Sequence, residues 1–364
     1  MIFFPETSEL SESISSISDL GALKLDDLVQ DSSQIEQKGR TLVAFDEGKC
    51  LAIKLCLKKG DEAKLLKEAH IQDRLHEDRL EIGLCSRLPR PLALGWKRSE
   101  HKDYLFKLLD LPADKKAELN LSVDPCAICY VVDESYFTYL NDPLLDAEDV
   151  IRGLTLCARD LAKLARKGLI HDSLIPLFHN REQVDLRTDS GVYRWFPMIP
   201  GRLDRWRDSC SYPNLRASGI ADFEHFSFVY QASAGKMRHH LGDHLLSMSL
   251  ILGSYCRNKG QFDLETMSTA LESFFEAYYT AFTSRRSPLE ECIDWDHLAC
   301  RMKEEMDGDK YMMAIIRCEG PDGKDLMVKS GPHLGHFSGF FPLPEIIKAI
   351  HLTTLFAVME IESS

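Results

Sequence analysis

The segment from residue 50 to residue 57, Cys-Leu-Ala-Ile-Lys-Leu-Cys-Leu, places one charged side chain inside an otherwise apolar run. Residues 41–46, Thr-Leu-Val-Ala-Phe-Asp, precede it, and Glu47-Gly48-Lys49 between the two runs is typical of a hairpin turn. An unpaired charge on a half-buried strand is costly. The sequence therefore predicts a pair of strands on which Lys54 has an acidic partner elsewhere in the chain.

The next segment supplies that partner. Gly60 and Asp61 open a predicted helix of about fifteen residues, which carries its apolar residues on one side and ends near Asp78. Glu68 lies on this helix and is the predicted partner of Lys54. Further strands are predicted at residues 91–96, 103–110 and 127–133. The first third of the chain is thus expected to be mostly β with one helix.

The pattern changes after Asp146. Residues 146–167 have the apolar spacing of an amphipathic helix, and further helices are predicted at residues 239–256, 263–283 and 344–359. A hairpin is predicted at residues 311–318 and 325–329, around the turn Gly320-Pro321-Asp322-Gly323. We expect four parts: an N-terminal arm (1–38), a small β-rich lobe (39–140), a helical lobe (141–304) and a C-terminal hairpin and helix extension (305–364).

Residues capable of chemistry recur in four separated segments. The segments are Leu51-Ala52-Ile53-Lys54, then Gly168-Leu169-Ile170-His171-Asp172-Ser173-Leu174-Ile175-Pro176, then Gly219-Ile220-Ala221-Asp222-Phe223-Glu224, and finally Gly242-Asp243-His244-Leu245. In this order and spacing they resemble the protein-kinase-like superfamily, in its aminoglycoside-phosphotransferase-like or pseudokinase branch. The resemblance covers about residues 40–285. It implies an α+β, two-lobed protein-kinase-like fold, with a small β-rich N-terminal lobe and a larger helical C-terminal lobe.

The resemblance also implies roles for individual residues and two cofactors, ATP and Mg²⁺. Lys54 would hold phosphate and Glu68 would orient Lys54, while Asp222 and Asn180 would hold Mg²⁺. Asp172 would position or deprotonate the acceptor hydroxyl. In the helix that begins near Gly242, Asp243 would anchor the backbone of the catalytic loop.

The catalytic loop departs from the family pattern at its most important position. Ser173 stands where the family has its catalytic Asp, so Asp172 lies one place early. Phe178 stands where the family has its metal-binding Asn, so Asn180 lies two places late. The plain alternative is that Asp172 or Ser173 only satisfies free backbone N–H groups. Glu224 occupies the position where Gly is usual.

A glycine-rich phosphate loop is also lacking before the Lys54 strand, because residues 25–38 contain no glycine. Three functions therefore stay open: an ATP-dependent phosphotransferase of unknown acceptor, a pseudokinase acting as a nucleotide- or partner-binding module, and a nucleotidyl transferase. The role of the Gly/His segment at residues 331–339 is also open, and we favour packing over ligand binding there.

The composition disfavours two classes of binding partner. A formal net charge of -13 disfavours nucleic-acid binding and electrostatic attachment to an anionic membrane. The N-terminus has neither the basic flank nor the apolar core of a signal peptide, so we expect a soluble cytoplasmic protein. The 11 cysteines lie mainly in apolar segments, which favours buried free thiols over a disulfide framework.

Overall fold

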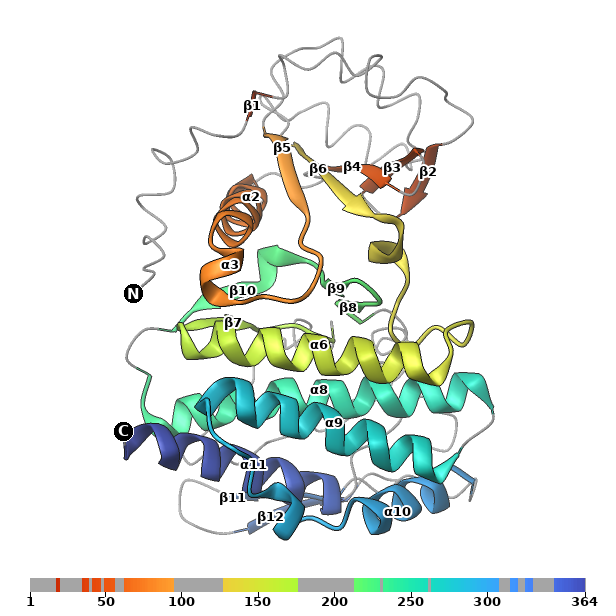
Figure 1. Ribbon diagram of the computed structural model, residues 1–364, viewed down its shortest axis with the longest axis vertical. Helices are drawn as coiled ribbons and strands as arrows, with labels where there is room; N and C mark the ends of the chain where they lie inside the picture. Colours follow the sequence, from red (N-terminus) through yellow and green to blue (C-terminus); the bar gives the residue numbers. More distant parts are fainter. Residues whose placement is uncertain are drawn as a thin grey trace. The chain divides into compact units, whose positions relative to one another are not determined.

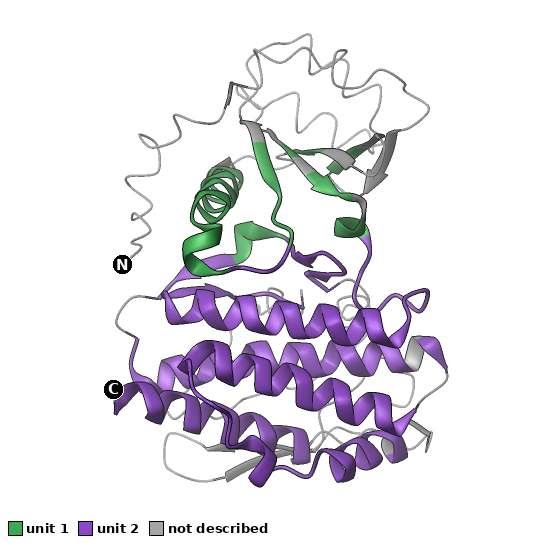
Figure 2. Ribbon diagram, in the orientation of Figure 1, with its two compact units in different colours: residues 1–83, 87–137, 222–225 green, residues 84–86, 138–221, 226–364 purple. Residues whose placement is uncertain are grey.

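The chain has a mixed α+β fold in the computed structural model, as the sequence predicts (Figure 1). The structure describes residues 18–19, 35–38, 41–46, 49–55, 62–94, 127–175, 213–229, 232–260, 263–307, 315–319, 325–329 and 344–363. The chain divides into two compact units, coloured separately in Figure 2. Unit 1 contains residues 1–83, 87–137 and 222–225, and unit 2 contains residues 84–86, 138–221 and 226–364.

Unit 1 is built on a six-stranded sheet whose strand order is β1-β5-β6-β4-β3-β2. The strands are β1 (Ser18–Asp19), β2 (Ile35–Lys38), β3 (Thr41–Asp46), β4 (Lys49–Leu55), β5 (Arg90–Leu94) and β6 (Ala127–Asp133). β3 and β4 pair antiparallel with Asp46 opposite Lys49, which is the hairpin predicted from Glu47-Gly48-Lys49. Because β4 is bordered on both sides, Lys54 lies between Thr41 of β3 and Ile128 of β6.

One helix of unit 1, α2 (Glu62–Glu77), carries the acidic partner of Lys54, and the short helix α3 (Arg79–Ile82) follows it. One face of α2 is completely buried and consists of Leu65, Glu68, Ala69, Gln72 and Leu75, spaced three and four residues apart. Two of these five side chains are polar. A helix that buries polar groups on its apolar face requires partners for them from the rest of the unit.

Unit 2 is mainly helical. Its long helices are α6 (Ala147–Arg166), α8 (Ala234–Lys259), α9 (Leu264–Thr283), α10 (Trp295–Asp307) and α11 (Pro344–Glu362). α9 contacts α6, α10 and α11, so it lies in the middle of this bundle (Figure 1). Its buried side chains are mostly aromatic: Phe274, Phe275, Tyr278, Tyr279 and Phe282. Asp146 caps α6 by accepting a hydrogen bond from the backbone N–H of Asp149 at 2.7 Å.

Short strands in unit 2 place the loops that carry polar residues. β7 (Leu169–His171) pairs antiparallel with β10 (Phe226–Phe228), and β8 (Leu215–Arg216) pairs with β9 (Gly219–Ile220). β7 leads directly into Asp172, and β9 leads through Ala221 into Asp222. β11 (Ile315–Glu319) and β12 (Asp325–Lys329) form the antiparallel hairpin predicted near the C-terminus.

Several predictions concern residues beyond the described part of the chain. The strand at residues 103–110 and the Gly/His segment 331–339 lie outside it, as do Asn180 and Phe178. Residues 35–38, assigned from the sequence to an N-terminal arm, form strand β2 of the sheet. None of the described helices is long and apolar enough to cross a membrane.

Candidate nucleotide and metal site

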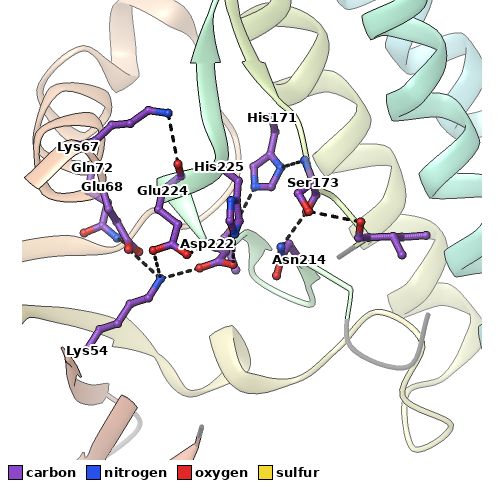
Figure 3. A network of polar contacts seen from close by, with 12 residues as sticks. Lys54, Lys67, Glu68, Gln72, His171, Ser173, Asn214, Asp222, Glu224 and His225 are labelled. Atoms are coloured by element: carbon purple, nitrogen blue, oxygen red, sulfur yellow. Dashed lines mark hydrogen bonds and ion pairs between the residues drawn. The ribbon is translucent and has the colours of Figure 1, made fainter. Parts of the chain in front are cut away.

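Lys54 is the centre of an ionic cluster within unit 1 (Figure 3). Its Nζ lies 2.8 Å from Glu68 Oε2, 2.6 Å from Asp222 Oδ1 and 3.6 Å from Glu224 Oε2. Lys54 is 5 % exposed and Glu68 is fully buried, so water contributes little to their stabilisation. The pairing predicted between Lys54 and Glu68 is therefore present, and it is a buried pair whose loss would be costly.

Glu68 is held by its own helix as well as by Lys54. The amide Nε2 of Gln72, one turn later on α2, donates to Glu68 Oε1 at 3.3 Å. Burial raises the pKa of Glu68, and the positive charge of Lys54 offsets only part of that effect. Both carboxylate oxygens of Glu68 thus have a donor, and its position relative to β4 is fixed.

The second acidic element is a single turn of 3-10 helix, η5 (Phe223–His225), which follows Asp222 and contacts α2. Asp222 has a backbone φ of 61°, a left-handed conformation that Asp tolerates better than most residues. Glu224 lies within the 3-10 turn, so the position where the family has Gly does not require glycine here. Lys67 Nζ donates to the backbone carbonyl of Glu224 at 3.3 Å and fixes the turn to α2.

His225 faces two of the three carboxylates that surround Lys54. Its Nε2 lies 2.9 Å from Asp222 Oδ2 and 3.4 Å from Glu224 Oε1. Burial alone would raise the pKa of Asp222, but the Lys54 charge and the His225 hydrogen bond outweigh it and hold that pKa well below its usual range. Asp222 is therefore ionised at neutral pH and available to a cation.

Asp222, Glu224 and His225 form a group that can ligate a metal ion. One ligand atom from each of the three lies within 4.8 Å of the others, and all three side chains are partly accessible. Carboxylate oxygens are the donors that Mg²⁺ prefers, so the set fits a divalent cation. Of the residues predicted to bind metal, Asp222 belongs to this group, whereas Asn180 lies outside the described residues. Glu224 and His225 were not predicted.

Asp172, the predicted catalytic base, lies at the end of β7 in unit 2 and is half-buried. The hydroxyl of Ser227, on the paired strand β10, donates to Asp172 Oδ2. Ser173 is fully buried; its N–H donates to His171 Nδ1 at 3.2 Å and its hydroxyl to the carbonyl of Ile175 at 3.4 Å. Of the two neighbours, Asp172 is thus the accessible carboxylate and Ser173 is a structural residue of the loop.

His244 anchors the described part of this loop, a role that the resemblance implied for Asp243. His244 Nε2 lies 3.2 Å from the carbonyl oxygen of His171, and its Nδ1 lies 2.8 Å from the hydroxyl of Tyr278. Asp243, one residue earlier on α8, instead lies 3.5 Å from His239 Nε2. Burial lowers the pKa of His244 to about 4, so the imidazole is neutral and both of its nitrogens are satisfied.

Asn214 is a second residue that the sequence did not reveal. Its Nδ2 donates to the carbonyl of Ser173 at 2.8 Å, and its own carbonyl accepts from the N–H of Ala221 at 2.9 Å. Asn214 is 5 % exposed. It therefore ties the loop after β7 to the backbone that runs into Asp222. It follows an irregular stretch without periodicity, so no sequence signal distinguished it.

Comparison with known proteins gives one partial match. A stretch of 194 residues is 31% identical to the calmodulin-dependent glutamylase SidJ of Legionella pneumophila. The match covers 51% of this chain but 22% of SidJ, so this chain corresponds to a minor part of that protein. No protein-family model matches the chain.

Proposed function

We propose that this protein is a kinase-like, ATP-using transferase. The observation that carries the proposal is the cluster in which Lys54 pairs with both Glu68 and Asp222, the three residues to which the kinase resemblance assigns phosphate and metal binding. Burying one ammonium with two carboxylates costs desolvation free energy. Such clusters are common at functional sites, which favours a role in binding or catalysis.

In this proposal the residues of the cluster bind and orient ATP. Lys54 holds phosphate oxygens, and Glu68 keeps the ammonium of Lys54 in place through the 2.8 Å contact. Asp222, with Glu224 and His225 beside it, would hold Mg²⁺. The ion would neutralise the charge that develops on the transferred phosphate. Most of the rate enhancement would come from positioning and charge neutralisation.

Asp172 is the proposed base, or the residue that positions the acceptor. Its carboxylate is half-buried and already accepts a hydrogen bond from Ser227, which fixes its orientation. Ser173 cannot serve instead, because its hydroxyl is buried and bonded to the loop. The proposal predicts that Asp172→Asn lowers the transfer rate by about 10²-fold or more and leaves nucleotide binding intact.

The similarity to SidJ favours one class of acceptor substrate for this protein. A glutamylase joins the amino group of glutamate to a carboxylate, and a free carboxylate must first be activated. Attack of a carboxylate oxygen on the γ-phosphorus of ATP gives an acyl phosphate and ADP; attack on the α-phosphorus gives an acyl adenylate and pyrophosphate. The amine of glutamate then displaces phosphate or AMP, and Asp172 would accept the proton that this amine loses. We therefore propose a protein carboxylate as acceptor and glutamate as second substrate, with calmodulin as a protein partner to be tested.

The decisive experiment follows the products of ATP. The purified protein is incubated with Mg²⁺, glutamate and candidate acceptor proteins, with and without calmodulin, and with ATP labelled at either the α- or the γ-phosphate. ADP identifies phosphoryl transfer, and AMP with pyrophosphate identifies nucleotidyl transfer. Lys54→Met should abolish formation of both products. The control Lys64→Met, which replaces an exposed lysine of α2, should match the wild type.

Ser227→Ala is the matched control for Asp172→Asn, because it removes the hydrogen-bond donor and leaves the carboxylate. We expect no more than a several-fold loss of rate for Ser227→Ala. ATP binding without any turnover under all of these conditions would support the pseudokinase alternative. Absence of both binding and turnover would refute the proposed function.

A further inference from the structure

We infer that Asp222, Glu224 and His225 form a mixed oxygen–nitrogen metal site that binds divalent transition-metal ions such as Mn²⁺ and Co²⁺ more tightly than Mg²⁺. The inference deepens the proposed function, since it concerns the ion used at the same site. It rests on the identity and placement of the three side chains within unit 1.

The donor atoms of the three side chains are spaced much as ligands of one ion would be. Two ligands that occupy neighbouring positions around one ion, each about 2.1 Å from it, lie about 3 Å apart. His225 Nε2 is 2.9 Å from Asp222 Oδ2 and 3.4 Å from Glu224 Oε1. The imidazole nitrogen is thus already near the separation from each carboxylate that a shared ion requires, and the three ligand atoms all lie within 4.8 Å of one another.

Each of the two carboxylates divides its oxygens between Lys54 and His225. Asp222 directs Oδ1 to Lys54 and Oδ2 to His225, and Glu224 directs Oε2 to Lys54 and Oε1 to His225. Lys54 therefore lies beside one oxygen of each carboxylate, in a hydrogen bond of 2.6 Å with Asp222 and an ion pair of 3.6 Å with Glu224, while the other oxygen faces the imidazole (Figure 3). Contacts to the non-ligating oxygens are a common way to orient carboxylates that bind metal.

Charge supports the same conclusion. Three carboxylates, those of Glu68, Asp222 and Glu224, surround the single ammonium of Lys54 in this cluster. A divalent cation would add positive charge where carboxylates outnumber ammonium groups. Closely placed carboxylates that are shielded from water gain more from a cation than exposed ones do.

The imidazole of His225 determines which cation the site prefers. Mg²⁺ prefers oxygen ligands and gives up its water reluctantly, whereas imidazole nitrogen suits the first-row transition ions. A set of two carboxylates and one imidazole should therefore bind Co²⁺ more tightly than Mn²⁺, and Mn²⁺ more tightly than Mg²⁺. If His225 only donated a hydrogen bond to Asp222, replacing His225 would not change the order of metal affinities.

The test measures metal binding to the full-length protein without nucleotide, so it does not depend on turnover. Free Mn²⁺ is followed by electron paramagnetic resonance, Co²⁺ by visible absorption, and Mg²⁺ by competition. Glu224→Gln and His225→Gln should each weaken Mn²⁺ binding by about tenfold or more. Glu77 and His76 are exposed residues at the end of α2. The control variants Glu77→Gln and His76→Gln should bind Mn²⁺ as tightly as the wild type does.

His225→Asp distinguishes a ligand from a structural residue. This change replaces nitrogen by oxygen, so the variant should still bind a divalent ion but lose most of its preference for Co²⁺ over Mg²⁺. Circular dichroism confirms that each variant folds, and His225→Asp keeps the inference testable if His225→Gln does not. Equal metal affinity and preference in the wild type, His225→Gln and His225→Asp would overturn the inference. Absence of ATP binding alongside the expected metal preference would instead refute only the proposed function.

Discussion

Lys54 in unit 1 and His244 in unit 2 are both buried polar side chains, but their surroundings satisfy them differently. Lys54 is surrounded by the carboxylates of Glu68, Asp222 and Glu224, so its environment is strongly charged. His244 is neutral and lies between one hydroxyl and one backbone carbonyl. A charged cluster is suited to binding an ion or a phosphate, whereas a neutral network that satisfies itself is suited to holding a loop in place.

The largest expected effect comes from removing the only positive charge that Glu68 directly contacts among the described residues. Lys54→Met keeps the length of the side chain but leaves a buried carboxylate without its ammonium. We expect a loss of about 3–5 kcal/mol in the free energy of unfolding, measured by urea denaturation. The double variant Lys54→Met/Glu68→Gln should recover part of this loss, because it removes the uncompensated charge.

A failure of that recovery would mean that the cost lies in packing rather than in charge. The exposed Lys64→Met serves as the control for the loss of a lysine and should change stability by less than about 0.5 kcal/mol.

The second prediction concerns a backbone position in unit 2. Gly219 has a φ of 143°, and a Cβ added there would lie 2.3 Å from Ser86 Cβ. Ser86 cannot withdraw easily, because its N–H donates to the buried carboxylate of Asp160 at 2.7 Å and its hydroxyl donates to the same group. Gly219→Ala should therefore lower the free energy of unfolding by about 2–3 kcal/mol.

Ser86→Gly removes the atom that the new methyl group would meet, so Gly219→Ala/Ser86→Gly separates the two causes. If steric overlap dominates, the double variant should be more stable than the sum of the single effects predicts. If backbone strain dominates, the two effects should add. Thermal melting of the four proteins measures the difference.

The sequence was sufficient to predict that Lys54 pairs with Glu68, because a charged residue on a half-buried strand needs a partner. Asp222 was implied by the resemblance to kinases. The sequence did not predict that Glu224 and His225 complete the cluster. The resemblance to a kinase draws attention to Asp222, and η5 turns the next two polar side chains back towards it.

The difference between Asp243 and His244 has a simple geometric origin. Adjacent residues on a helix point about 100° apart, so a motif aligned one residue out of phase selects the wrong face. The buried positions of α8 include Leu241, Leu245 and Met248, and this face includes His244 but not Asp243. Helical periodicity would have favoured His244 over the family pattern.

The third prediction uses the neutral state of His244. The groups that face it are His240 and Asp243 on its own helix, Tyr278 on α9 and His171 on β7. Its pKa is about 4 in the folded protein and about 6.5 in the unfolded chain, so only the unfolded chain gains a proton between these values. Stability should therefore fall as the pH decreases from about 6.5 to 4, by on the order of 3 kcal/mol from this residue.

His244→Gln tests that assignment, because glutamine can hydrogen-bond but does not ionise in this range. At pH 7.5 the variant should be less stable by about 1–2 kcal/mol, owing to imperfect hydrogen bonds to Tyr278 and His171. Its loss of stability between pH 6.5 and pH 4 should be clearly smaller than that of the wild type. An unchanged slope, measured by urea denaturation at several pH values, would show that another group causes the acid sensitivity.

The smallest expected effect tests whether Gln72 in unit 1 is satisfied as completely as His244 in unit 2 is. Gln72 is fully buried and donates to Glu68, but its Oε1 has no hydrogen-bond partner among the described residues. Gln72→Met preserves the length of the side chain and removes an unsatisfied acceptor together with a useful donor. The gain and the loss are each about 1–2 kcal/mol, so the net change should be within about 1 kcal/mol.

That near-cancellation distinguishes Gln72 from His244, where both hydrogen bonds are made and a substitution can only lose them. If Gln72→Met destabilises the protein as much as His244→Gln does, then Oε1 has a partner and the polar face of α2 is fully satisfied. If the change is small while metal and ATP binding weaken, Gln72 acts by holding Glu68 for its contact with Lys54. Stability and ligand affinity, measured on the same protein samples, therefore decide whether α2 buries its polar residues for the fold or for the site.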